Sequence, residues 1–121
     1  MKIYYGKAIY DKKEINASLS VLKSKSLTLI DGPLVKELEK KISKLFGKKY
    51  GLMVNSGSSA NLLALASLNL KKGDEVITPT LTFSTTVAPI YQLGLTPHFI
   101  DVESNSFVAK IDQIKNAINK K

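Results

Sequence analysis

Residues 53–79, MVNSGSSANLLALASLNLKKGDEVITP, change hydrophobic pattern twice within a short distance. An apolar run that ends at Val54 meets the polar segment Asn-Ser-Gly-Ser-Ser, which is followed directly by a stretch rich in alanine and leucine. The pattern predicts a strand over residues 50–54, a helix over residues 58–70 and a second strand over residues 75–78. A strand that leads into a helix through small polar residues is typical of an α/β protein.

The same alternation continues toward the C-terminus. Residues 84–93 predict a helix that ends at Gly94, residues 96–102 predict a third strand, and isoleucines at helical spacing predict a last helix over residues 111–118. Because strands alternate with helices, we expect right-handed crossovers and a mostly parallel sheet with flanking helices. The fold class is therefore α/β.

Two further helices are predicted before this α/β region. Asp11 and Glu14 have the spacing of a capping box, and the helix that they begin should fade near Lys25. Pro33 suits the first turn of the second helix, and Gly47 is a natural stop for it. The buried stripe of the second helix is expected to consist of Val35, Leu38, Ile42 and Leu45. We expect residues 1–48 to form an N-terminal helical segment and residues 49–121 an incomplete α/β domain, together a single truncated domain.

The composition excludes several classes of function. The 121 residues contain no cysteine, which excludes disulfides, thiolate metal sites and cysteine nucleophiles. No stretch approaches the ~20 apolar residues of a membrane span, and no signal peptide is recognisable, so we expect a cytoplasmic protein with no membrane partner. The net charge is +8, but all 18 basic residues are lysines without interleaved aromatic residues, which favours a solvated surface over nucleic-acid binding.

Residues 55–60 can form an anion site where the first strand meets its helix. The N–H groups at a helix N-terminus point at an anion, and the helix dipole favours negative charge there. Gly57 would allow close approach of a phosphate, and serine hydroxyls would add hydrogen bonds. The segment lacks the lysine and spacing of a P-loop and the glycines of a dinucleotide fingerprint. The alternative is that Ser56 only caps the helix and Gly57 only relieves a tight turn.

An aromatic residue follows the next strand. Phe83 lies in TPTLTFSTTVAP, residues 78–89, beyond what should be the carboxyl end of a buried strand. Ligands of open α/β sheets bind at that edge, where Phe83 could stack on a flat ring. The alternative is an ordinary core phenylalanine. Because both corners lie at the same sheet edge, a phosphorylated aromatic cofactor explains them jointly. No residues have the spacing of metal ligands, so no metal site is predicted.

Several ordered segments resemble the DegT/DnrJ/StrS-type pyridoxal-phosphate (PLP) enzymes, which are sugar aminotransferases of the aspartate-aminotransferase-like fold. The segments are GPLVKELEKKISKLFGKKY, VNSGSSANLLAL, KKGDEVITPTLTFSTTV and GLTPHFIDVESNSF. The resemblance implies the N-terminal part of the large domain of a fold type I PLP-dependent transferase. It also implies that Gly57, Ser58 and Ser59 bind the cofactor phosphate and that Phe83 stacks on the pyridine ring. The family's Schiff-base lysine and the aspartate at the pyridine nitrogen would lie beyond residue 121, so no catalytic residue is expected in this chain.

The resemblance implies amino transfer from glutamate to a nucleotide-linked keto sugar, in polysaccharide, lipopolysaccharide or antibiotic-sugar biosynthesis, by a homodimer. A second branch is also similar: NSGSSANLLAL and the pattern F-x-TTV-x-PI at residues 83–90 resemble the 3-dehydratases. Those enzymes use pyridoxamine phosphate (PMP) on nucleotide-linked 4-keto-6-deoxy sugars. TPTLTF, in contrast, is similar to the aminotransferase branch. The remaining alternative is an inert fragment that acts only as a binding or interaction module.

Overall fold

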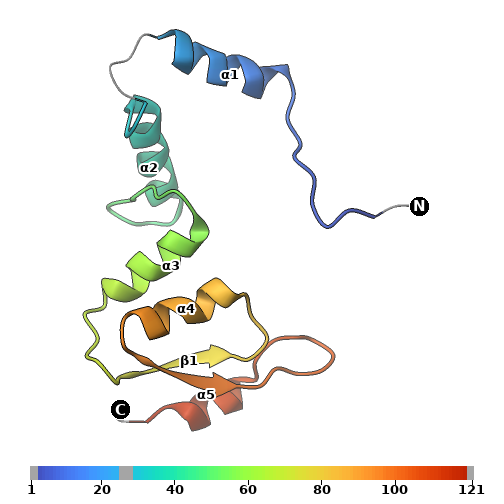
Figure 1. Ribbon diagram of the computed structural model, residues 1–121, viewed down its shortest axis with the longest axis vertical. Coiled ribbons are helices and arrows are strands. Elements are labelled where there is room, and N and C mark those ends of the chain that lie inside the picture. The colour runs from blue at the N-terminus through green and yellow to red at the C-terminus, as the bar shows by residue number, and fades with distance from the viewer. Residues whose placement is uncertain (1–2, 25–28, 120–121) are drawn as a thin grey trace. The chain divides into compact units, whose positions relative to one another are not determined.

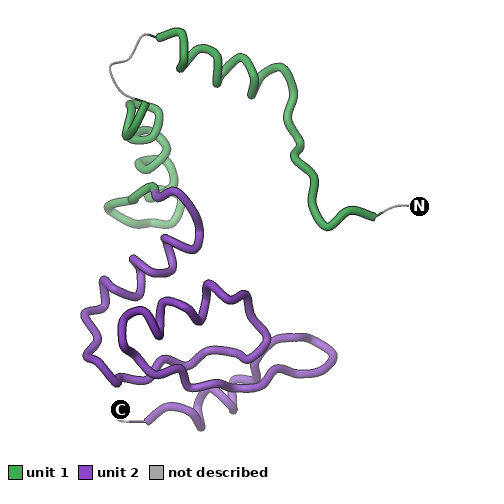
Figure 2. Tube along the Cα trace, viewed as in Figure 1, with its two compact units in different colours: residues 1–53 green, residues 54–121 purple. Residues whose placement is uncertain are grey.

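The computed structural model describes residues 3–24 and 29–119, which form five α-helices and two β-strands (Figure 1). The chain divides into two compact units, residues 1–53 and residues 54–121 (Figure 2). From the N-terminus the elements are α1 (Lys12–Lys23), α2 (Pro33–Leu45), α3 (Gly57–Ala66), β1 (Glu75–Pro79), α4 (Ser84–Gln92), β2 (Thr96–Ile100) and α5 (Ile111–Ala117).

Helix α1 begins at the predicted capping box. The Asp11 carboxylate accepts a hydrogen bond from the Lys13 N–H at 2.6 Å, and the Glu14 carboxylate accepts one from the Asp11 N–H at 2.7 Å. Two N–H groups that the helix itself cannot satisfy are thus paired, and the prediction is confirmed. The helix ends at Lys23, whereas Lys25, where it was expected to fade, lies outside the described residues.

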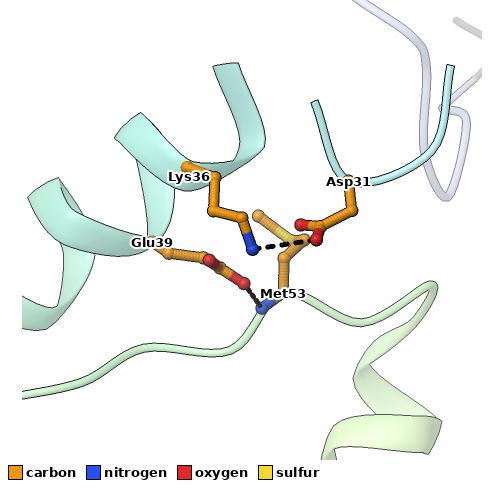
Figure 3. A network of polar contacts seen from close by, with 4 residues as sticks. All are labelled: Asp31, Lys36, Glu39 and Met53. Carbon is orange, nitrogen blue, oxygen red and sulfur yellow. Dashed lines mark hydrogen bonds and ion pairs between the residues drawn. The ribbon is translucent and has the colours of Figure 1, made fainter. Parts of the chain in front are cut away.

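Helix α2 begins and ends as the sequence predicts. Pro33 is its first residue, and Gly47 lies just beyond its end with a φ of 63°, a left-handed conformation that glycine adopts without strain. Lys36, in the first turn of the helix, donates a hydrogen bond at 2.8 Å to the carboxylate of Asp31, which precedes the helix (Figure 3). This hydrogen bond raises the pKa of Lys36 above its ordinary value.

The expected buried stripe of α2 is wrong. Val35 is half-buried, but Leu38 and Ile42 are exposed and Leu45 is 74% exposed, while Ser43 is the buried residue of the helix at 7%. The reason is that the following segment packs on a different face of the helix. A Cβ on Gly51 would lie 2.7 Å from the backbone oxygen of Glu39. The backbone at Gly51 therefore lies closer to the helix than a residue with a side chain would allow.

The strand predicted over residues 50–54 does not form. The N–H of Met53 donates to the Glu39 carboxylate at 2.7 Å (Figure 3). A side chain of α2 thus accepts a backbone hydrogen bond that, in a strand, would go to a neighbouring strand. A strand also needs a neighbour, and the sheet in the described part of the chain consists only of β1 and β2. An apolar run without a partner strand stays irregular.

In the second unit, β1 and β2 are parallel, as predicted, with Ile77 paired to His98 in the centre of the register. Helix α4 connects the two strands and contacts both, while α5 contacts β2; in Figure 1, α4 lies above the strands and α5 below them. The buried apolar residues come from these elements and the turn before β2. They are Ile90, Leu95, Ile100 and Ala117.

Two elements of this unit end earlier than predicted. Helix α3 stops at Ala66 instead of residue 70: the N–H groups of Leu68 and Asn69 donate to carbonyls three residues earlier, and Asn69 then adopts a left-handed φ of 53°. Strand β2 stops at Ile100, and Val102 instead forms an isolated antiparallel bridge with Ala109. Helix α4 ends before Gly94, which has a φ of 71°, as predicted.

Candidate functional site

The N-terminus of α3 is built around Ser56. The Ser56 hydroxyl accepts a hydrogen bond from the Ser59 N–H at 3.1 Å and donates one to the Ser59 hydroxyl at 3.1 Å. The Ser59 hydroxyl is therefore an acceptor here and keeps its own hydrogen for another partner. The N–H groups of Gly57 and Ser58 and the hydroxyl of Ser58 form no hydrogen bond with the described residues. We call residues 57–59 the serine turn.

Gly57 is not required by the fold of this unit. Its φ lies outside the left-handed region, and a Cβ at this position would meet no atom within 4 Å. The interpretation that Gly57 relieves a tight turn is therefore wrong. The space beside its backbone is open to a ligand, and an anion at a helix N-terminus needs such an approach. The serine turn thus has free donors and open space beside its backbone, which are the features an anion site at a helix N-terminus needs.

Phe83 is the N-cap residue of α4 and follows the carboxyl end of β1. Its side chain is 72% exposed, so the alternative interpretation as a core phenylalanine is wrong for this unit. A phenylalanine ring has no polar atom that could cap the helix, so helix capping does not explain why a phenylalanine stands at this position. What the exposed ring offers is a flat apolar face for another ring.

Helix α3 packs on α4, and a hydrogen bond joins α3, just after its first turn, to the first turn of α4. The side-chain amide of Asn61 donates to the backbone oxygen of Thr85 at 3.4 Å. The serine turn and the first turn of α4 also line one shallow cavity of about 190 Å³, which Phe83 does not line. The lining residues are Ser58, Ser59, Leu62, Thr85, Ala88, Pro89 and Gln92.

The remaining polar candidates lie at both ends of the sheet. Glu75 is the first residue of β1, and its Oε2 is 3.2 Å from Nδ1 of His98, the middle residue of β2. Asp101 follows the carboxyl end of β2, and its carboxylate accepts hydrogen bonds from the Val102 N–H at 2.8 Å and from the Thr80 hydroxyl at 3.5 Å. Among the residues that the structure describes, no group of three or more His, Cys, Asp or Glu side chains could hold a metal ion. None of the described helices is long and apolar enough to span a bilayer.

Comparison with known proteins identifies a family. Residues 8–121 match the sequence model of the DegT/DnrJ/EryC1/StrS aminotransferase family. Among curated proteins, the GDP-4-keto-6-deoxy-D-mannose 3-dehydratase of Yersinia pseudotuberculosis is 41% identical over 118 residues, which are 93% of this chain and 30% of that protein.

Solved structures of two kinds of enzyme match the chain. The Escherichia coli GDP-4-keto-6-deoxy-D-mannose-3-dehydratase with bound hydrated PLP matches 94% of this chain and 30% of its own, with a TM-score of 0.84 and 42% identity. The protein Spr1654 of Streptococcus pneumoniae, assigned as a sugar aminotransferase, matches in its PLP and PMP forms. It covers 100% of this chain and 30% of its own, with a TM-score of 0.89 and 29% identity.

These matches confirm the expected fold class, the N-terminal part of the large domain of a fold type I PLP-dependent transferase. The chain spans about 30% of the length of the proteins that it matches. Both branches that the sequence suggested are represented among them, and the similar curated proteins include several named as 3-dehydratases of nucleotide-linked sugars.

Proposed function

The chain belongs to the DegT/DnrJ/EryC1/StrS aminotransferase family, and from this premise we propose that it forms part of a PMP-dependent 3-dehydratase of nucleotide-linked 4-keto-6-deoxy sugars. The observation that carries the proposal is the serine turn, whose free donors lie at the helix that packs on α4. The names of the relatives favour this activity over the amino transfer that the sequence suggested first. Such a reaction fits a place in the biosynthesis of cell-surface polysaccharide.

The serine turn would hold the phosphate of the cofactor, PMP or PLP. The N–H groups of Gly57 and Ser58 and the Ser58 hydroxyl have no other partner among the described residues. Ser59 would add its remaining hydroxyl hydrogen, and Ser56 would keep Ser59 in place through its two hydrogen bonds. Neutral donors at a helix N-terminus stabilise the negative charge of a phosphate without a lysine nearby.

Phe83 would bind the pyridine ring by stacking. Its exposed ring follows β1 at the sheet edge where ligands of α/β proteins bind. When bound, the cofactor supplies an amino group and a conjugated ring that accepts electrons. Phosphate anchoring and ring stacking together would orient that ring. The residues that act on the sugar itself are proposed to lie outside residues 1–121, since the chain spans about 30% of its relatives.

The second candidate is a PLP-dependent aminotransferase that transfers the amino group of glutamate to a nucleotide-linked keto sugar. The Streptococcus pneumoniae protein, which matches the entire chain, supports this alternative. The same residues would hold the cofactor in both activities. We further propose a cytoplasmic homodimer in which residues 1–48 form an N-terminal helical segment before the cofactor-binding region at residues 49–121. Neither proposal includes a nucleic acid or a membrane as a partner.

The activity can be tested on the complete protein as its gene encodes it. The protein would be titrated with PMP and with PLP and then incubated, with and without glutamate, with GDP- and dTDP-linked 4-keto-6-deoxy sugars. A 3-dehydratase removes the oxygen at C3, whereas an aminotransferase yields an amino sugar, and mass spectrometry separates the two products. Failure to bind either cofactor would contradict both proposals and leave the inert binding module as the remaining explanation.

A further inference from the structure

Helix α4 contains a proline that removes one of its internal hydrogen bonds. Pro89 lies inside the helix and is buried. In an α-helix the N–H of each residue donates to the carbonyl oxygen four residues earlier, so the missing N–H of Pro89 would have reached Thr85. The carbonyl of Thr85, in the first turn of α4, therefore lacks its ordinary helical partner.

A side chain of α3 donates to that carbonyl instead. The Nδ2 atom of Asn61 lies 3.4 Å from the oxygen of Thr85. Asn61 also lines a second cavity, of about 420 Å³, together with Thr86 and Pro89. A helix carbonyl without its internal donor needs water, a side chain or another group, and here the amide comes from the neighbouring helix. Pro89 thus opens an acceptor on α4 that Asn61 uses.

The position of this hydrogen bond relates it to the candidate cofactor site. Asn61 follows the serine turn within one helical turn of the same helix, so its position is fixed relative to the residues that would hold the phosphate. Thr85 follows Phe83 within the first turn of α4, so its backbone is fixed relative to the residue whose ring would stack on the pyridine. The hydrogen bond joins the two elements that one ligand would have to contact at once.

We propose that Asn61 is a positioning residue, which holds the Phe83 end of α4 in register with the serine turn by donating to the carbonyl that Pro89 leaves without a helical partner. This inference rests on the proposed function for the identity of the ligand. Asn61 does not touch the cofactor in this proposal. It acts through the relative placement of two binding elements, because a ligand that contacts both is bound well only when both are in place.

The test compares a ligand that needs both elements with one that needs only the serine turn. Asn61→Leu removes the donor and keeps a side chain of similar size. In the complete protein we expect this variant to weaken PMP binding about threefold to tenfold, as the loss of one hydrogen bond allows. Binding of inorganic phosphate, measured by its competition with PMP, should stay within about twofold. Asn116→Leu, at an exposed asparagine of α5, is the matched control and should change neither affinity.

A double-mutant cycle tests the role of Pro89. Pro89→Ala restores an N–H that can satisfy Thr85 within the helix, so Asn61→Leu should weaken PMP binding less than about twofold in that background. Pro89→Ser restores the same donor and replaces the alanine variant if that one is too unstable to purify. An equal effect of Asn61→Leu in both backgrounds would overturn the assigned role of Pro89.

Two other results would overturn the positioning role itself. Unchanged PMP binding by Asn61→Leu would do so while leaving the proposed function intact. An equal loss of PMP and phosphate affinity, together with a lower melting temperature, would mean general destabilisation. If the unmodified protein binds no PMP, the proposed function and the positioning role fail together. In that case, amide hydrogen exchange in the first turn of α4, measured for the four proteins of the double-mutant cycle, would still test the contact between Asn61 and Thr85.

Discussion

His98 and Glu75 join the two strands across their pairing, with His98 Nδ1 3.2 Å from Glu75 Oε2. The side-chain amide of Asn119, which follows α5, donates to the same carboxylate oxygen at 2.6 Å. This cluster therefore ties the amino end of β1 to β2 and to the residues after α5. Phe83 follows the opposite, carboxyl end of β1, so the single histidine of the sequence is hydrogen-bonded on the side of the sheet away from Phe83 and supports the sheet.

Replacing this histidine should affect stability without affecting ligand binding. We expect His98→Leu to lower the free energy of unfolding by about 0.5–1 kcal/mol, because the pair is only partly shielded from water. Denaturant unfolding measures this loss. The PMP affinity should stay within about twofold, since the partner of His98 is Glu75, at the end of β1 away from Phe83. A much larger loss of PMP affinity would mean that His98 takes part in the site.

Gly57 and Gly51 should respond to alanine in opposite ways. At Gly57 a Cβ meets nothing within 4 Å, so Gly57→Ala should leave stability unchanged or raise it by up to about 1 kcal/mol. If a phosphate binds against this backbone, the same methyl group should weaken PMP binding by roughly tenfold or more. Titration with PMP and thermal unfolding give the two values.

Gly51→Ala is the matched control for this prediction. Its Cβ would lie 2.7 Å from the backbone oxygen of Glu39, so the chain must shift, and we expect a loss of about 1–3 kcal/mol in stability. The PMP affinity of the folded Gly51→Ala protein should be normal. Unchanged PMP binding by Gly57→Ala would remove Gly57 from the proposed phosphate site.

Ser56 and Ser58 are neighbours with separable roles. Ser56→Ala removes the N-cap of α3 and should cost about 1 kcal/mol in the free energy of unfolding. Ser58→Ala removes a hydroxyl that has no partner among the described residues, so its stability should change by less than about 0.5 kcal/mol. Its PMP affinity should nevertheless fall about threefold to tenfold, because one hydrogen bond to the phosphate is lost. The reverse assignment, with Ser58→Ala destabilised and PMP binding intact, would contradict the site.

Phe83 can be tested against a core residue of the same helix. Because Phe83 is 72% exposed, Phe83→Ala should change stability by about 0.5 kcal/mol or less. Loss of stacking should weaken PMP binding about twofold to tenfold, and Phe83→Tyr should restore the affinity. Ile90, which is 1% exposed, provides the contrast: Ile90→Ala should cost about 2–5 kcal/mol. PMP binding that is indifferent to the ring at position 83 would exclude Phe83 from the site.

Much of the fold could be predicted because its signals are local. The capping box at Asp11, the start of α2 at Pro33 and the end of α4 before Gly94 depend on residues within one helical turn of each other. The parallel pairing of β1 and β2 follows from two apolar strands joined by a helix. The donors of the serine turn follow from the geometry of any helix N-terminus.

The sequence by itself determined the order of the five helices and of β1 and β2, the starts of α1 and α2, and the family resemblance that gives the serine turn and Phe83 their proposed roles. Only the tertiary structure decided which apolar residues are exposed, that residues 50–54 form no strand, and that Asn61 donates to Thr85. The physical reason is that burial, strand pairing and side-chain contacts between helices depend on what lies next to a residue in space. Pro89 is visible in the sequence, but the partner that satisfies the carbonyl it leaves open comes from a different helix.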